Sequence, residues 1–332
     1  MGTILSLILT SITAPLLMFY PGAQPCGMAG AYVAVAENSW ACFYNPAGLG
    51  ALLERSVGAE FVSVPSSDTG HYWSCAAAYP LKHGLAVGLF GSGLNEHQES
   101  RYGISHTTGF DAGVSIAYAP TRWAAVGANI KYFRSLQSEQ AETTSAPCFD
   151  VGMLERYDLP LGQVRAGFAV RNLGPGIPSS NDSSGWPVGW RGGVSYEVSA
   201  DQLLSPDGKA WFAPAFGSAA AYWFRHWRLI LSYDITQYFI RERTYIHSYS
   251  ERPWHSLGVE LRPLPFLPIR FGFFRNMTPE DDAGTSSGWT GGVGLDFRRF
   301  QLDVADDWFA FLPTYPSSTE PRRLRLSLGA EF

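Results

Sequence analysis

Lysine is nearly absent from this chain, since only Lys82, Lys131 and Lys209 occur among its 332 residues. Long helical surfaces of Lys and Glu are therefore excluded, and no stretch from Arg55 onward repeats its apolar residues with a helical period. Runs of like charge are also missing, because 24 basic and 29 acidic residues are scattered and sum to a net charge of −5. Without a basic stripe, nucleic acid is not an expected partner.

Catalytic and metal-binding motifs are absent too. The chain has no Gly-x-Ser-x-Gly elbow, no His-Glu-x-x-His motif and no P-loop. His255 and Ser256 are adjacent, so they would point to opposite faces of a strand. No Cys–His spacing resembles a zinc site. We therefore expect no enzyme activity, no cofactor and no metal. The four cysteines could pair in an exported protein, and Cys26 with Cys42 is the only close couple. Alternatively the cysteines serve as small apolar residues, as Cys75 and Cys148 would in their strand-like runs.

Glycine and aromatic residues are abundant instead, with 35 Gly, 21 Phe, 16 Tyr and 11 Trp. From Arg55 onward, short runs alternate apolar and polar residues between turn residues, as β-strands do. A soluble β-sandwich would share this pattern, but a Lys-poor and aromatic-rich composition favours a transmembrane barrel. The predicted strands are 57–64, 71–79, 84–91, 110–119, 124–134, 148–156, 163–173, 188–198, 211–223, 227–235, 256–262, 268–275, 289–297, 300–304 and 324–332.

The predicted fold is all-β: a transmembrane antiparallel β-barrel of about 14 strands, allowing for an error or two among these runs. An even number of strands brings both termini of a single-chain barrel to the periplasmic side. Residues 236–253 are expected to form an extra hairpin or to extend a strand beyond the membrane. Loops rich in turn residues are predicted at 92–108, 136–147, 174–187, 199–210, 276–288 and 306–322.

Charged residues occupy the polar parity of several predicted strands. Each would cost roughly 2–4 kcal/mol if it faced acyl chains at mid-membrane, so these residues are expected to face the lumen. Because both signs occur, they could pair across the lumen and partly close it. In a soluble sheet they would form an ordinary solvated face. The predicted lumen-facing charges are Arg165, Arg171, Arg191, Glu197, Asp234, Glu260, Arg262 and Asp296.

The two ends of the chain carry export signals. The last strand, Leu324 to Phe332, resembles the closing strand of bacterial outer-membrane barrels, in which a terminal Phe marks the chain for insertion by the barrel assembly machinery. The apolar stretch Ile4 to Tyr20 predicts a signal peptide over residues 1–23, cleaved after Ala23. No Lys or Arg precedes Arg55, so either the start is displaced or the signal is atypical. We expect the protein to lie in the bacterial outer membrane.

Small residues dominate 27–36, and the run Tyr44-Asn45-Pro46-Ala47-Gly48-Leu49 follows. This segment resembles the N-terminal hatch of the FadL-like, TodX-type outer-membrane proteins, most closely their PorV/PorQ branch. Weaker matches follow in order at 149–152, 169–174, 257–262, 269–273 and 326–332. The resemblance implies a barrel over residues 55–332 that is plugged by a hatch over residues 24–54. Its motif residues would be Gly27, Gly30, Ala31, Asn45, Pro46, Ala47 and Gly48.

Asn45 and Pro46 also suit a tight turn before the first strand, because Asn bonds neighbouring backbone and Pro fixes the chain direction.

Two functions follow from the resemblance. The PorV/PorQ branch implies a component or accessory of protein secretion and cell-surface attachment, with type IX secretion subunits or cargo as partners. The alternative is a passive transporter of hydrophobic small molecules, fatty acids or aromatics, gated by the hatch. Sequence similarity favours the first, and outer-membrane lipid surrounds the barrel in both.

Overall fold

The computed structural model describes residues 15–18, 20–64, 70–100, 103–137, 142–174, 186–200, 227–241, 246–248, 253–276, 287–307 and 323–332. The strands within these ranges are β1 (Ser56–Val64), β2 (Gly70–Pro80), β3 (Leu85–Ser100), β4 (Gly103–Thr121), β5 (Ala124–Gln137), β6 (Glu142–Leu159), β7 (Gly162–Leu173), β8 (Trp186–Ser199), β9 (Arg228–Arg241), β10 (Ile246–Ser248), β11 (Trp254–Leu264), β12 (Leu267–Asn276), β13 (Ser287–Phe297), β14 (Phe300–Asp307) and β15 (Arg323–Glu331).

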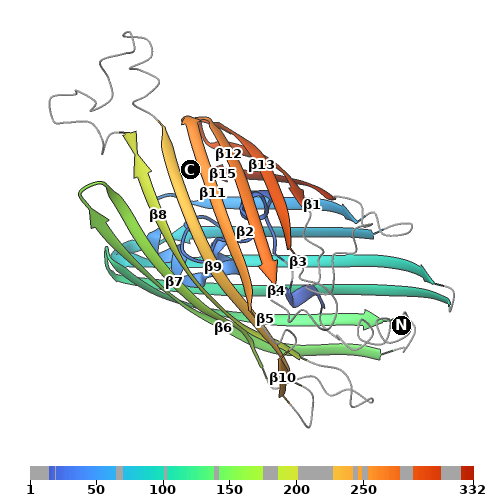
Figure 1. The fold of residues 1–332 in the computed structure, drawn as a ribbon. Helices are drawn as coiled ribbons and strands as arrows, with labels where there is room; N and C mark the ends of the chain where they lie inside the picture. Colours follow the sequence, from blue (N-terminus) through green and yellow to red (C-terminus); the bar gives the residue numbers. More distant parts are fainter. Residues whose placement is uncertain are drawn as a thin grey trace.

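Antiparallel pairing joins these strands into a closed barrel (Figure 1). β15 pairs with β1, and β8 pairs with β9, so the fourteen long strands have no free edge. The short β10 is a fifteenth strand that pairs with β9 alone. β10 pairs with the end of β9, past the last residues that β9 pairs with β11. This is the region where an extra hairpin or a strand extension is predicted. The prediction of an all-β antiparallel barrel of about 14 strands is confirmed.

Side chains alternate between the two faces of the wall, as the sequence pattern predicts. Outward apolar residues are exposed, for example Ile130 (62 %) and Phe271 (59 %), whereas the neighbouring Lys131 and Arg270 are buried on the inner face. An apolar outer face suits lipid, because a closed barrel leaves no unpaired backbone groups in the membrane. No helix in the described part of the chain is long and apolar enough to cross a membrane. The protein is a bacterial outer-membrane β-barrel.

Two predicted loops are wrong in part. β3 and β4 continue their ladder through Asn95↔Thr108 to Ser100↔Gly103, where a loop over 92–108 is predicted. Likewise β5 and β6 pair as far as Gln137↔Glu142 within the predicted loop 136–147. These hairpins lengthen the wall because backbone hydrogen bonds, which need no apolar side chains, carry the ladder onward. The predicted strand 211–223 lies outside the described residues.

The barrel has two unlike ends. At one end, which we call the turn end, short connections join β2 to β3, β4 to β5, β6 to β7, β11 to β12 and β13 to β14. The first of these contains the short 3-10 helix η3 (Lys82–Gly84). Arg55 and Phe332 exchange backbone hydrogen bonds of 3.1 and 3.0 Å there, so the start of β1 and the end of β15 lie at the turn end. The connection from β8 to β9 also lies at the turn end, and the connections from β7 to β8, β12 to β13 and β14 to β15 lie at the opposite end, which we call the loop end.

Candidate functional site

Residues 20–52, which we call the inner segment, occupy the interior of the barrel (Figure 1). They form α2 (Ala23–Gly27), α3 (Ala41–Tyr44) and the 3-10 helix η2 (Pro46–Ala51), preceded by η1 (Pro15–Met18). The backbone of the segment bonds inward-facing side chains on opposite sides of the wall. Ala29 N donates to Thr290 Oγ1 of β13 at 3.0 Å, and Asn129 Nδ2 of β5 donates to Cys42 O at 2.7 Å. The segment is therefore held from several directions.

The motif Asn45-Pro46-Ala47-Gly48 builds a turn that also contacts the wall. Asn45 Oδ1 accepts from Ala47 N at 3.2 Å and caps η2, in which Pro46 takes the first position. Its amide nitrogen donates to Val33 O and to Met153 O of β6, each at 3.0 Å. A Cβ on Gly48 would lie 1.7 Å from Ala36 O, so only glycine fits there. The tight turn and the wall contact, weighed as alternatives from the sequence, coexist.

The first half of the motif is equally buried. Gly27 approaches Gly292 of β13 so closely that a Cβ would lie 3.3 Å from its Cα. Gly30 has a φ of 73°, in the left-handed region that favours glycine, and Ala31 has no exposed surface. A role of these motif residues as a gating hatch stays a prediction.

Inward-facing glycines of the wall make room for the inner segment. At nine of them, an added Cβ would come within 3.3 Å of an atom of residues 27–49. These contacts are closer than ordinary van der Waals distances, so the wall is shaped to the backbone of the segment. We call this set the glycine collar; its members lie on nine different strands and are Gly58, Gly88, Gly127, Gly152, Gly167, Gly193, Gly258, Gly272 and Gly292.

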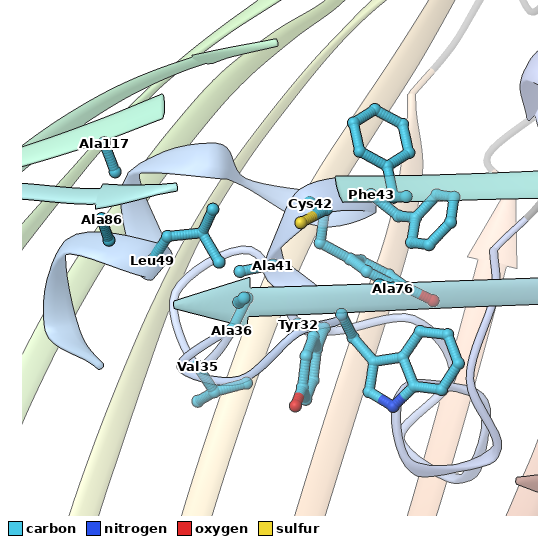
Figure 2. Close-up of a cluster of buried hydrophobic side chains, with 14 of the residues drawn as sticks. Tyr32, Val35, Ala36, Ala41, Cys42, Phe43, Leu49, Ala76, Ala86 and Ala117 are labelled. Atoms are coloured by element: carbon cyan, nitrogen blue, oxygen red, sulfur yellow. The ribbon is translucent and has the colours of Figure 1, made fainter. Parts of the chain in front are cut away.

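An apolar cluster fixes the centre of the segment to one side of the barrel (Figure 2). Tyr32, Phe43 and Leu49 pack with small inward-facing residues of the wall, among them Ala76 of β2 and Ala86 of β3. Phe43 meets Phe90 edge-on, with ring centroids 5.0 Å apart. Burial raises the pKa of the Cys42 thiol in this cluster to about 12, so the thiol is neutral at physiological pH.

Buried charges of the wall hydrogen-bond the backbone of the inner segment. Asp234 Oδ2 of β9 accepts from Tyr32 N at 2.8 Å and from Val33 N at 2.9 Å. Arg191 of β8 donates to Gly30 O at 3.3 Å, and its guanidinium carbon lies 4.3 Å from the ring centre of Tyr20. These charges thus stabilise main-chain dipoles instead of charged side chains of the segment.

A second such anchor joins β1 and β15 to the start of the segment. Glu60 Oε2 accepts from Gly22 N at 2.9 Å, and Arg325 donates to Tyr20 O at 2.8 Å and to Glu60 Oε1 at 3.3 Å. Residues 20–23 belong to the predicted signal peptide, and cleavage after Ala23 would remove the contacts of Tyr20 and Gly22 but keep the pair between Arg325 and Glu60. That cleavage site stays a prediction.

All eight predicted lumen-facing charges lie on the inner face of the wall. Arg165, Arg171, Arg191, Asp234 and Glu260 are buried, and Glu197, Arg262 and Asp296 are half-buried. Their ion pairs within the described residues join nearby strands, such as Arg165–Glu197 at 2.5 Å, or residues of one strand, such as Arg262–Glu260 at 2.7 Å. Arg165 also pairs with Glu37 of the inner segment at 3.3 Å. The expected pairing across the lumen is not what the structure shows, because the inner segment occupies the centre.

Several inner charges escaped the sequence analysis. Arg270 has no exposed surface and pairs with Glu260 at 2.6 Å and Asp303 at 2.5 Å. Lys131 pairs with Asp150 at 2.8 Å, and Glu37 of the inner segment lies 3.2 Å from Arg156. The same signal, a charge on the polar parity of a predicted strand, would have found Lys131, Asp150, Arg270 and Asp303.

The two ends of the interior differ in polarity. Toward the loop end, inward-facing residues form an apolar patch, which we call the loop-end cluster: Leu16, Leu17, Val62, Tyr72, Leu94, Phe133, Ala146 and Cys148. Toward the turn end lies a cavity of about 380 Å³ lined mainly by polar residues. The apolar members of its lining include Met28, Tyr32 and Phe300, and its charged members include Arg262, Asp296 and Arg299.

The remaining predicted features are placed as follows. Phe332 lies at the turn end with 48 % of its surface exposed, and its role in insertion stays a prediction. Cys26 and Cys42 are both buried, and no disulfide joins them. Within the described residues, no group of three or more His, Cys, Asp or Glu is placed to hold a metal ion.

The fold is shared with solved channel structures. No family model and no curated protein matches the sequence. The CymD monoaromatic hydrocarbon channel superposes with a TM-score of 0.57 at 11 % identity, covering 94 % of this chain and 97 % of that one. The chain has the fold of these channels. The Pseudomonas putida toluene transporter TodX gives 0.52 at 13 % identity over 94 % and 96 % of the two chains. A Pseudomonas aeruginosa FadL homologue gives 0.52 at 10 % identity over 95 % and 99 %.

Proposed function

We propose that this protein is a passive conduit for hydrophobic small molecules across the outer membrane. The observation that carries the proposal is a fold shared over almost the whole chain with a monoaromatic hydrocarbon channel and a toluene transporter. Because those structures are named as a channel and a transporter, they favour the conduit over the secretion role that the sequence suggested first. The PorV/PorQ assignment stays a prediction.

The interior offers a physical reason for a hydrophobic solute. Inner faces of barrels are generally polar, yet the loop-end cluster places Leu94, Phe133 and Tyr72 on the inner face. Tyr72 and Phe133 have no exposed surface and pack with Leu16 and Leu17. Cleavage of the predicted signal peptide would remove these two leucines, and an apolar molecule in their place would gain roughly 25 cal/mol per Å² buried. The cluster lies beside the inner segment, since Leu16, Leu17 and Tyr72 line a small cavity together with Cys42 and Phe43. A solute captured there would meet the segment before it reached the polar cavity at the turn end.

Uptake measurements test the proposal. Bacterial cells producing the protein should take up labelled toluene or a labelled long-chain fatty acid faster than cells without it. The variant Phe133→Glu, which places a charge in the loop-end cluster, should lower uptake. Ser115→Ala, a buried inner-face change outside the cluster, serves as the matched control. Equal uptake with and without the protein, for both solutes, would refute the conduit; recovery of secretion subunits with the purified protein would then favour the secretion role.

A further inference from the structure

Three arginines surround Phe332 at the turn end. Arg55 exchanges two backbone hydrogen bonds with Phe332, and Glu331 N donates to Arg299 O at 2.8 Å. Arg298 and Arg299 form the two-residue turn between Phe297 and Phe300, which pair with each other. The start of β1, the end of β15 and the β13–β14 turn are thereby brought together, and all three arginines are exposed.

Two of these arginines lie against aromatic rings of the outer face. The guanidinium carbon of Arg55 is 4.7 Å from the ring centre of Tyr79, and that of Arg298 is 5.6 Å from the ring centre of Phe297. Both rings are exposed, at 43 % and 70 %. Stacking on a ring leaves the N–H groups at the edge of a guanidinium free to donate. Further along the same rim, Arg122 stacks on Trp123 in the same way, at 4.9 Å.

Negative charge neutralises this group only in part. Within the described residues, no ion pair engages Arg55, Arg298 or Arg299. Glu54 and Glu331 are both exposed on the same rim, and Arg298, Arg299 and Glu331 also line the cavity at the turn end. Three positive charges and two exposed negative charges leave a net charge of +1 beside a belt of aromatic rings.

The turn itself favours a residue other than arginine. Arg298 has a φ of 56°, in the left-handed region that favours glycine. A glycine would adopt this conformation without strain, and Asn-Gly or Gly-x sequences are the usual choice for two-residue hairpin turns. The chain instead places two successive arginines at the membrane interface.

We propose that Arg55, Arg298 and Arg299 bind the phosphate of an anionic phospholipid in the leaflet that surrounds the turn end. Guanidinium groups donate two parallel hydrogen bonds to phosphate oxygens. Tyr79, Phe297 and Phe300 lie where the glycerol and upper acyl carbons of such a lipid would sit, and aromatic rings are enriched at that depth. The lipid would clamp the seam between β15 and β1, next to Phe332.

Lipid retention by the purified full-length protein tests this site. Native mass spectrometry of the protein released from detergent with phosphatidylglycerol or phosphatidylcholine should show preferential retention of phosphatidylglycerol. Each of Arg55→Gln, Arg298→Gly and Arg299→Gln should lower that retention about fivefold, the effect of one basic residue near an anionic surface. Arg298→Gly is the sharpest variant, because it relieves the backbone strain and so should fold at least as well as the wild type.

Arg134→Gln and Arg275→Gln are matched controls, since both arginines are exposed near the loop end. They should retain phosphatidylglycerol as the wild type does. Equal retention of the two lipids by the wild type, or an equal loss in the control variants, would overturn the proposal. Competition by lipopolysaccharide that is lost in the Arg298→Gly variant would also overturn it, because the phosphate would then come from a different lipid.

Discussion

Asp234 shows how one wall residue holds the inner segment. Its carboxylate accepts two backbone N–H groups of the segment and has no exposed surface. Removing it would leave both donors without this acceptor and the guanidinium of Arg191 nearby with less compensation. A buried donor left without an acceptor typically costs about 1–3 kcal/mol. Asp234 therefore stabilises the inner segment as well as its own strand, β9.

We expect Asp234→Ala to lower by several degrees the temperature at which the folded barrel loses its characteristic mobility in a detergent gel. Asp234→Asn should lie between this variant and the wild type, because its amide oxygen still accepts. Asp296→Ala is the control: Asp296 is also on the inner face, but its side chain is 24 % exposed. Equal shifts for the two alanine variants would contradict a specific role for Asp234.

A Gly→Ala substitution in the glycine collar tests the close packing between the wall and the inner segment. A Cβ on Gly167 would lie 2.5 Å from Val33 O and 3.0 Å from the Cα of Ala34, both of them backbone atoms that cannot rotate away. Overpacking of this kind typically costs about 1–3 kcal/mol, so Gly167→Ala should destabilise the barrel. Gly192→Ala on the adjacent β8, whose nearest neighbour would be 3.6 Å away, should not. Thermal unfolding followed by circular dichroism distinguishes the two.

At the scale of elements, the strands were more predictable than what lies between them. Runs such as 188–198 and 289–297 carry a period of two because lipid and the interior impose opposite preferences on the two faces. The parts of β3 to β6 nearest the loop end carry no such alternation, so the sequence predicts loops where the structure has hairpins. In the inner segment, the local turn at Asn45 and Pro46 was readable from the sequence. The rest was not, because it depends on contacts such as Asn45 with Met153, which lie far apart in sequence.

Chemical labelling of Cys42 tests whether the inner segment stays inside the barrel. Its thiol is fully buried and its raised pKa, about 12, keeps the thiolate near one part in a thousand at pH 9. We expect a maleimide to label Cys42 only after heat unfolding, with no gain between pH 7 and pH 9, as mass spectrometry of digested protein would show. Leu53→Cys supplies an exposed reference, since Leu53 is 94 % exposed. Labelling of Cys42 in the folded protein at the rate of residue 53 would mean that the segment leaves the barrel.

At the scale of the whole molecule, the alternation along the strands was enough to place the charges on the inner face, but it did not identify their partners. Arg165 and Glu197 are opposite one another only because β7 and β8 pair in one register. The sequence alone therefore suggested that they could pair across the lumen and partly close it. With residues 20–52 inside, the same charges instead bond the segment backbone and their neighbours on the wall, and the expected plug and the expected charges become parts of one packed interior.

This packing determines what the barrel should conduct. Fourteen strands enclose more space than an eight-stranded barrel, which side chains alone can fill, and less than the water-filled porins. Here the space is taken by the inner segment against the glycine collar.

The full-length protein in a planar lipid bilayer should therefore carry no steady ion current. A variant lacking residues 24–54 should show discrete current steps, because buried charges such as Asp234 and Arg191 would then line a water-filled lumen. Heat-shifted gel mobility confirms that the variant is folded, and Gly48→Val, which displaces the segment without deleting it, should give intermediate openings. Steady current through the full-length protein equal to that of the deletion variant would show that the segment does not close the barrel.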